Sequence, residues 1–94
     1  MIKFKNRYND DFFKAILTLK DIDECYKFFA DVCTPKEINT ISQRYVVAKM
    51  LTDGRVYSDI VAETGASTAT VSRVNRSLSD GNGGYDIVFE RLEK

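Results

Sequence analysis

The sequence predicts an all-α protein of six helices, and three observations lead to this prediction. The apolar residues recur at helical spacing instead of the strict alternation that is typical of strands. The chain has one proline, and its five glycines lie between the predicted helices, not within them. A chain of 94 residues supplies enough material for one core, so we expect a single domain spanning residues 1–94.

Two helices are expected within residues 1–33. The first begins near Asn9 or Asp10, since either side chain can cap a helix. The second begins at Asp21, with Glu24 three residues later in a carboxylate version of the capping box. This second helix carries an apolar stripe at helical spacing, which consists of Ile22, Cys25, Tyr26, Phe29, Val32 and Cys33. Because both cysteines lie in the stripe, we expect buried free thiols and not a redox pair.

Aromatic residues are concentrated at the start of the chain. Seven of the eleven lie within the first 29 positions. Two short helices cannot enclose so many rings between themselves, so the rings either cover the rest of the chain or meet a second copy. We expect a homodimer built through the helices of residues 1–33, and an ordinary monomer core is the alternative.

A long helix is expected over residues 34–54. Thr34 can accept a hydrogen bond from the backbone of Glu37, Glu37 can reach back, and Pro35 suits the first helical turn. The predicted apolar face of this helix consists of Ile38, Ile41, Tyr45, Ala48 and Leu51. The helix stops at Gly54.

Residues 56–78 have the pattern of a helix-turn-helix. A short helix from Ser58 ends at Gly65, where the chain must reverse, and a second helix begins with Ser67 as its N-cap. The predicted inner face of the pair consists of Ile60, Val61, Val71, Val74 and Leu78. A flexible loop and a last short helix, with Tyr85, Val88, Phe89 and Leu92 as its apolar positions, complete residues 79–94.

The opposite face of the second helix suits DNA. The chain is neutral, with 14 basic and 14 acidic residues, yet no acidic residue lies between Gly65 and Ser77. Small hydroxyl residues and an alanine let a helix enter the major groove, and arginines reach guanine edges or phosphates. The predicted DNA-binding residues are Ser67, Thr68, Ala69, Thr70, Ser72, Arg73 and Arg76. A merely solvated helix face is the alternative.

The composition argues against an enzyme and a metal site. The chain has no histidine, which removes Ser-His-Asp and Cys-His nucleophile pairs and His-ligated zinc. Two cysteines are too few for a zinc site made of cysteines alone, and no glycine-rich phosphate loop is present. No apolar run approaches the ~20 residues needed to span a bilayer, and no signal-peptide pattern opens the chain. We expect a cytoplasmic protein that does not bind membranes.

Two separated blocks of the sequence resemble the Trp repressor family. The first is Thr34-Pro35-x-Glu37 with the long helix that bears Arg44, and the second is Gly65-Ala66-x-x-Ala69-Thr70-Val71-Ser72-Arg73-x-Asn75-x-Ser77-Leu78. The resemblance covers roughly residues 10–80 and is closest to relatives of the YerC/YecD type. It implies an intertwined homodimer whose two reading heads enter successive major grooves of a palindromic operator, about 34–36 Å apart.

The resemblance also implies a ligand pocket. Residues at the positions that surround the family's corepressor are Thr34, Arg44, Thr70, Arg73 and Ser77. Val74, however, stands where the Trp repressor has a glycine beneath the indole, and Asp31 and Cys33 stand where it has leucines. A valine narrows the pocket floor, so we expect a different small-molecule corepressor, or no cofactor, in place of tryptophan. For Arg44 and Arg73 the alternatives are ion pairs with carboxylates and contact with phosphate.

These features together predict a sequence-specific DNA-binding transcriptional regulator, a repressor, whose partners are an operator in double-stranded DNA and a second copy of the chain. Two other functions remain open at this stage. One is a helical protein-interaction module that has lost operator recognition, and the other is a DNA-binding accessory factor.

Overall fold

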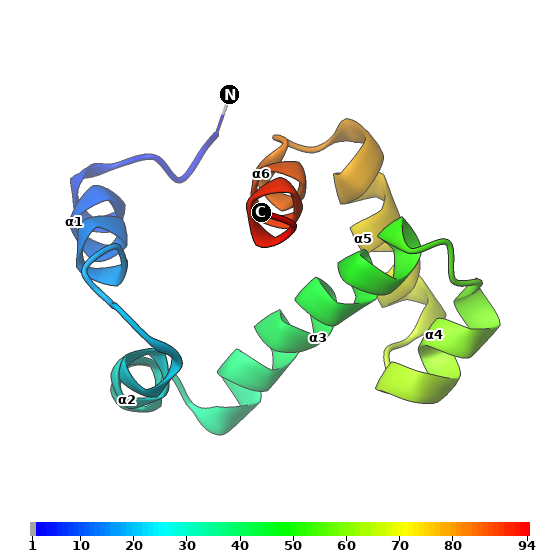
Figure 1. Cartoon of the computed structure of the whole chain (residues 1–94), viewed down its shortest axis with the longest axis horizontal. Helices are drawn as coiled ribbons and strands as arrows, with labels where there is room; N and C mark the ends of the chain where they lie inside the picture. The colour runs from blue at the N-terminus through cyan, green and yellow to red at the C-terminus, as the bar shows by residue number, and fades with distance from the viewer. Residues whose placement is uncertain (1) are drawn as a thin grey trace. The chain divides into compact units, whose positions relative to one another are not determined.

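The computed structural model of the chain describes residues 2–94, which form six α-helices and no strand (Figure 1). In chain order these are α1 (Arg7–Ile16), α2 (Ile22–Val32), α3 (Pro35–Thr52), α4 (Tyr57–Thr64), α5 (Thr68–Asp80) and α6 (Gly84–Leu92). The prediction of an all-α chain with six helices is therefore confirmed. The chain divides into two compact units, of which the first ends at Pro35 and the second begins at Lys36. No helix in this described part is both long and apolar enough to cross a lipid bilayer.

Helix α1 begins earlier than the sequence predicted. The side chain of Asn6 accepts a hydrogen bond from the backbone N–H of Asn9 at 2.9 Å, which makes Asn6 the N-cap. The Asn9 side-chain amide is engaged elsewhere, because it donates to the carbonyl of Phe4 at 2.6 Å. The prediction of a start near Asn9 or Asp10 is therefore wrong. Several cap-forming residues stand close together here, and the sequence pattern does not separate them.

Helix α2 begins as predicted, with Asp21 as its N-cap. The Asp21 carboxylate accepts from the backbone N–H of Glu24 at 2.8 Å. The Glu24 carboxylate reaches back one residue further than a capping box requires and accepts from the backbone N–H of Lys20 at 2.9 Å. The first bond satisfies an orphan N–H of the helix and the second ties the preceding residue to its first turn, which together fix where the helix starts.

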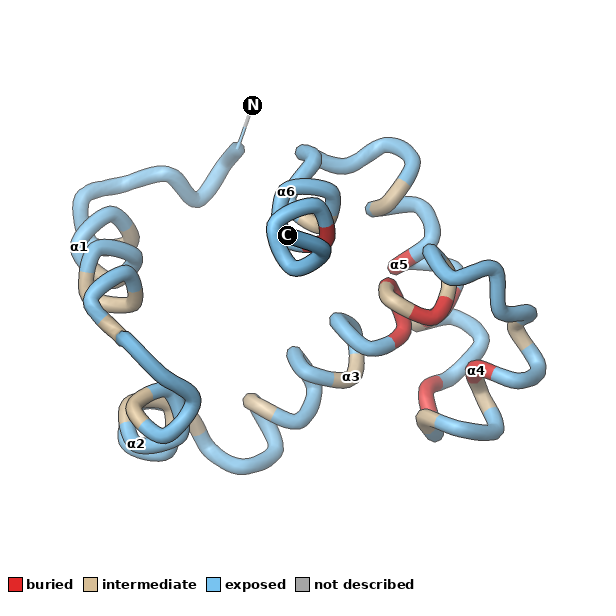
Figure 2. Tube along the Cα trace, in the orientation of Figure 1, coloured by how far each residue is buried: buried red, intermediate tan, exposed pale blue. Residues whose placement is uncertain are grey.

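The first unit has no buried core of its own. Helices α1 and α2 meet through stacked rings, with 6.0 Å between the centroids of Phe12 and Phe28. Neither helix contains a buried residue (Figure 2). The stripe predicted for α2 lies largely open, with Ile22 and Tyr26 about three-quarters exposed at 73% and 74%. A pair of short helices covers only part of each apolar face, so this unit leaves much apolar surface in contact with water.

The two cysteines are not the buried core residues that the sequence predicted. Both are free thiols, but Cys25 is exposed and Cys33 is only half-buried. The prediction took the stripe on α2 as the core-facing side. Within this unit, the ring that contacts α1 is that of Phe28, which lies outside the stripe.

The second unit has an apolar core that draws on all four of its helices and on the turn between α4 and α5. Figure 2 shows the buried positions clustered where α4 and α5 meet the second half of α3, with one more in α6. The buried residues are Val47, Ala48, Met50, Ile60, Ala66, Val71, Val74 and Phe89. Full burial of an aliphatic side chain of this size stabilises a fold by about 1.5–3 kcal/mol. This core fixes the second unit around α4 and α5.

The buried face of α3 differs in part from the predicted one. Ala48 is buried as expected, but so are Val47 and Met50, which the prediction left out. Ile41 and Tyr45 were expected in the core and are exposed. Within this unit, α4 and α5 lie toward the C-terminal end of α3 (Figure 1), whereas Ile41 lies nearer the other end of the helix.

Helix α5 ends at Gly81 for a steric reason. A Cβ atom at this position would collide with the backbone carbonyl of Ser77, one turn earlier in the helix. The φ angle of Gly81 is −84°, so the residue is needed for a close approach and not for a left-handed conformation. Helix α6 then follows as predicted and inserts Phe89 into the core. The loop before it is shorter than predicted, because α5 continues through Asp80, and Val88 and Leu92 of the predicted apolar positions are exposed.

Candidate nucleic-acid interface

Helices α4 and α5 form the predicted helix-turn-helix. Gly65 follows α4 with a φ angle of 74°, the left-handed conformation expected where the chain reverses. Its N–H donates to the carbonyl of Val61 at 3.0 Å. The hydroxyl of Ser67 accepts from the backbone N–H of Thr70 at 3.1 Å, so Ser67 is the N-cap of α5 as predicted. Both boundaries come from local signals that the sequence contains.

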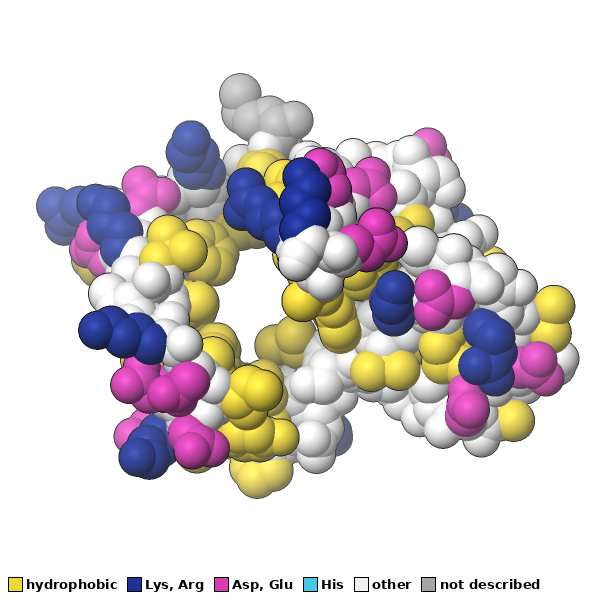
Figure 3. Space-filling model, viewed as in Figure 1, with side chains coloured by type: hydrophobic (Ala, Val, Ile, Leu, Met, Phe, Trp, Pro, Cys, Tyr) yellow, Lys and Arg dark blue, Asp and Glu magenta, His cyan; other side chains and the backbone are white. Residues whose placement is uncertain are grey.

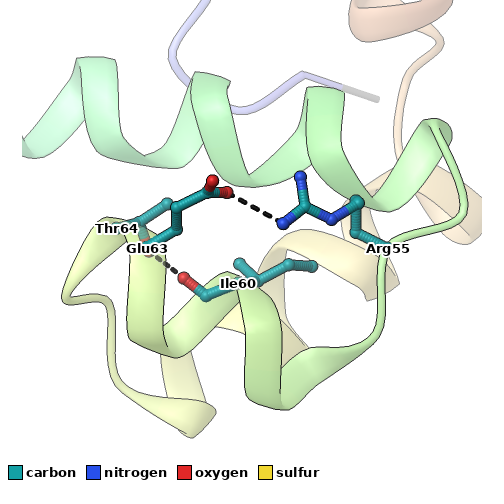
Figure 4. A network of polar contacts seen from close by, with 4 residues as sticks. All are labelled: Arg55, Ile60, Glu63 and Thr64. Carbon is teal, nitrogen blue, oxygen red and sulfur yellow. Dashed lines mark hydrogen bonds and ion pairs between the residues drawn. The ribbon is translucent and has the colours of Figure 1, made fainter.

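The turn between the two helices is organised by a threonine. The hydroxyl of Thr64 donates to the carbonyl of Ile60 at 2.7 Å (Figure 4) and accepts from the backbone N–H of Ala66 at 3.1 Å. Ala66 itself is 2% exposed, so its N–H needs a partner inside the protein. The Thr64 side chain therefore satisfies the backbone of the turn from within.

The inner face of the pair is the one that the sequence predicted. Ile60 and Val71 have no exposed surface, and Val74 is 3% exposed. Val61 and Leu78 are partly buried against the same cluster. Because these contacts fix the rotation of α5 about its axis, they also decide which of its residues point outward.

The predicted DNA-binding residues lie on the surface formed by the amino end of α5 and by its outward side. We call this surface the reading face, and it consists of Ser67, Thr68, Ala69, Thr70, Ser72, Arg73 and Arg76. All of these residues are exposed except Thr70, which is half-buried. The hydroxyls of Ser67 and Thr70 lie 3.0 Å apart and hydrogen-bond to each other. This pairing orients the Thr70 hydroxyl at the start of the helix.

The reading face carries positive charge without compensation. Ion pairs in the second unit join Lys49 to Asp53, Arg55 to Glu63 and Glu90 to Lys94. Arg73 and Arg76 take part in none of these pairs, which disfavours the alternative of a carboxylate partner for Arg73. Their guanidinium groups keep donors for phosphate oxygens or base edges, and the amino end of α5 adds a partial positive charge.

The residues predicted for a ligand pocket occupy different surroundings in the structure. Val74 belongs to the hydrophobic core, while Arg44 and Arg73 are exposed. Ser77 donates from its hydroxyl to the carbonyl of Arg73 at 3.2 Å. Ser77 also lines an open hollow of about 410 Å³, whose other lining residues are Tyr45, Gly81, Asn82, Gly84, Tyr85 and Val88. The sequence does not predict this hollow, because its lining residues come from three helices that are separated along the chain.

A helix-turn-helix with a buried inner face, whose second helix has no acidic residue up to Ser77, places the chain in the class of helix-turn-helix proteins. Comparison with known sequences then gives the family, because the chain matches the family model of the Trp repressor protein over residues 8–93. The chain belongs to the Trp repressor family, as its resemblance to that family implied. Members of this family are typically helix-turn-helix DNA-binding regulators and not enzymes.

Individual relatives agree with this assignment. The chain is 48% identical over 92 residues to the uncharacterised protein YerC of Bacillus subtilis (strain 168), with 98% of this chain and 88% of that protein covered. A solved TrpR-like protein from Eubacterium eligens ATCC 27750 is 62% identical, with a TM-score of 0.93 over 97% of this chain and 94% of the other. A solved Trp repressor candidate from Staphylococcus aureus is 49% identical, with a TM-score of 0.92 over 97% of this chain and 91% of the other.

Proposed function

We propose that this protein is a sequence-specific transcriptional repressor that reads the major groove of operator DNA with α5. The observation that carries the proposal is the reading face, which is exposed and free of acidic side chains. Two arginines without carboxylate partners, Arg73 and Arg76, lie on this face. The family supports it, since its members are typically DNA-binding regulators. Such a regulator acts on chromosomal DNA, so we place the protein in the cytoplasm.

The side chains of the reading face suit the chemical groups that DNA presents in and beside its major groove. Its amino end offers hydroxyls and methyl groups from Ser67, Thr68, Ala69 and Thr70, which suit phosphate oxygens and thymine methyls. Arg73 and Arg76 lie further along the same side, at the spacing of one helical turn. The α5 helix has 13 residues and is about 20 Å long, so it spans a major groove about 12 Å wide.

We further propose that the protein binds DNA as a homodimer joined through the first unit. Large apolar side chains lie open there, as Figure 3 shows for the surface of α1 and α2. Leu17 and Tyr8 are 83% and 78% exposed. Apolar surface of this kind is characteristic of protein interfaces, and a second copy would cover it. Two reading heads on one dimer would fit a palindromic operator with half-sites about 34–36 Å apart.

DNA binding by this protein does not depend on tryptophan. Val74 occupies the position where the resemblance places a glycine beneath the bound indole. With 3% of its surface exposed, Val74 packs in the hydrophobic core beside Val71 and Ile60. A β-branched side chain has few rotamers through which it could move aside. The burial of Val74 supports this part of the proposal.

Selection of bound sequences from a random DNA pool tests the main proposal. The enriched sequence and a scrambled version of it are then compared in binding experiments at several salt concentrations. A specific regulator should prefer the enriched sequence by about 10³-fold or more. Equal affinity for the two sequences would contradict the proposal, and capture of a protein partner without DNA would favour an interaction module.

Arginine variants identify the surface that binds. Replacing Arg73 or Arg76 with alanine should weaken operator binding without changing helix content. An arginine that reads a guanine should contribute about 1–3 kcal/mol of discrimination, whereas one that contacts only phosphate should lower the salt slope by about one. Arg91→Ala removes the same charge from α6 and serves as the matched control. Unchanged binding in both variants of α5 would mean that the reading face is merely solvated.

A further inference from the structure

A side chain of α3 holds the carboxyl end of α4. The last carbonyl groups of a helix have no partners within it, so other groups must satisfy them. The carbonyl of Thr64 closes α4, and it accepts a hydrogen bond from the side-chain amide of Gln43 at 3.2 Å. Gln43 lies 21 residues earlier in the sequence, on α3, and the bond is partly buried. The bond therefore links the helix beneath the helix-turn-helix to the turn itself.

Thr64 connects this bond to the rest of the turn. Its hydroxyl donates to the carbonyl of Ile60 at 2.7 Å, as seen in Figure 4, and accepts from the N–H of Ala66 at 3.1 Å. Its carbonyl is occupied by Gln43. The backbone between α4 and α5 is thus tied to α4 through one group of Thr64 and to α3 through another.

The nearby ion pair connects the last turn of α4 to a different element from α3. Figure 4 shows Arg55, in the connection between α3 and α4, facing Glu63 in the last turn of α4, and their side chains lie 3.0 Å apart. Their side chains are 42% and 59% exposed, so water and salt screen the attraction. This pair links the loop that enters α4 to the last turn of the same helix, whereas the Gln43 bond links that turn to α3.

We propose that Gln43 is a positioning residue for DNA recognition, which acts by holding the Thr64 carbonyl and so fixing the amino end of α5. This inference rests on the proposed function. The apolar contacts beneath α5 are not directional, but a hydrogen bond constrains both distance and angle. Ser67, Thr68 and Thr70 follow Thr64 within six residues, so a shift of the turn moves the first part of the reading face. Gln43 itself needs no contact with DNA.

The Gln43→Glu variant tests the bond with little change in shape. A carboxylate only accepts hydrogen bonds, so at neutral pH it repels the Thr64 carbonyl. A protonated carboxyl group can donate, and the ordinary glutamate pKa is about 4.3. Placement beside a carbonyl favours the neutral form and moves protonation to higher pH. The variant should therefore bind the selected DNA about tenfold more weakly than wild type at pH 7.5 and approach wild type near pH 5.

Two further variants separate the bond from other effects. Asn39→Asp adds the same charge to an exposed position of α3, one turn before Gln43, and should bind as wild type does. Gln43→Met keeps the length of the side chain without a donor and should lose about 3- to 10-fold in affinity for the selected sequence at every pH. Non-specific DNA should be bound almost equally by all variants, because phosphate contacts tolerate small shifts of α5.

Amide hydrogen exchange of the free protein supplies a readout without DNA. The N–H groups of Gly65 and Ala66 should exchange faster in Gln43→Met than in wild type, while those of the α3 core should not change. If wild type itself binds no DNA specifically, the proposed function fails, and the exchange data still test the role of Gln43. A loss in Gln43→Glu that is the same at both pH values, or a loss of the same size in Asn39→Asp, would overturn the inference. Unchanged exchange at Gly65 and Ala66 would overturn it as well.

Discussion

The two units of the chain treat their apolar side chains in opposite ways. In the second unit, a buried cluster takes residues from α3, α4, α5 and α6. In the first unit, α1 and α2 bury none of their residues, and Leu17 remains 83% exposed. Both units have amphipathic helices, so the difference comes from the number of helices that meet. Helical spacing says which residues share a face, and the number of packed neighbours decides whether that face is buried.

Truncation in the core of the second unit should have the largest effect. Ile60 has no exposed surface, so Ile60→Ala should lower the free energy of unfolding by about 2–5 kcal/mol. The loss should be the same at low and high protein concentration, because this core lies within one chain. Urea denaturation measures it, with Val56→Ala, at an exposed position, as the control. A small loss that grows on dilution would contradict the view that the second unit is self-contained.

Truncation in the first unit should act mainly on association. Phe12 packs on Phe28 and is half-buried, so Phe12→Ala should weaken the dimer by about 1.5–3 kcal/mol. Sedimentation equilibrium at micromolar concentration should show two chains for wild type and a shift toward one chain for the variant. Ile60→Ala, tested while still folded, should keep the mass of two chains. If the wild-type protein had the mass of a single chain, this result would contradict the proposed dimer.

Replacing Val74 with glycine tests whether the second unit, unlike the first, is complete without a further binding partner. Calorimetry should detect no binding of L-tryptophan to wild type, because Val74 fills the core. Val74→Gly should allow measurable binding, since the methyl groups weaken a site by roughly one to two orders of magnitude. Val71→Gly, also on the buried side of α5, removes the same volume elsewhere and should not bind. Tight binding to wild type, with operator affinity rising in step, would show that the second unit needs a ligand.

The smallest effect is expected from the exposed ion pair of Arg55 and Glu63. A double-mutant cycle with both alanine variants should give a coupling energy below about 1 kcal/mol, which falls at high salt. A larger coupling that resists salt would show that charge, and not apolar packing, dominates this part of the second unit.

The sequence predicted the helix-turn-helix more accurately than any other part of the chain. Gly65 and Ser67 are local signals, because a left-handed residue and an N-cap need only their immediate neighbours. The spacing of Val71, Val74 and Leu78 then identified the inner face of α5. The reading face followed from the same periodicity. Its role in DNA binding stays a prediction, as do the single-domain organisation and the residues of the ligand pocket.

Features that depend on distant neighbours were predicted less well. Ile41 belongs to the apolar face of α3 that the sequence predicts, and only the packed structure shows that it is exposed. Cys25 was predicted to be buried for the same reason. The Gln43–Thr64 bond spans 21 residues, and a glutamine near the middle of a helix carries no signal of such a partner.

The glycines at the two ends of α5 differ in which substitutions they tolerate. Gly65 needs a positive φ but has open space around its missing side chain, so an asparagine could replace it with modest strain. Gly81 has an ordinary φ but no room, because any Cβ would collide with the backbone of Ser77. Every other residue type should therefore be selected against at position 81. A deep mutational scan for folded protein would see one partly tolerant glycine before α5 and one invariant glycine after it.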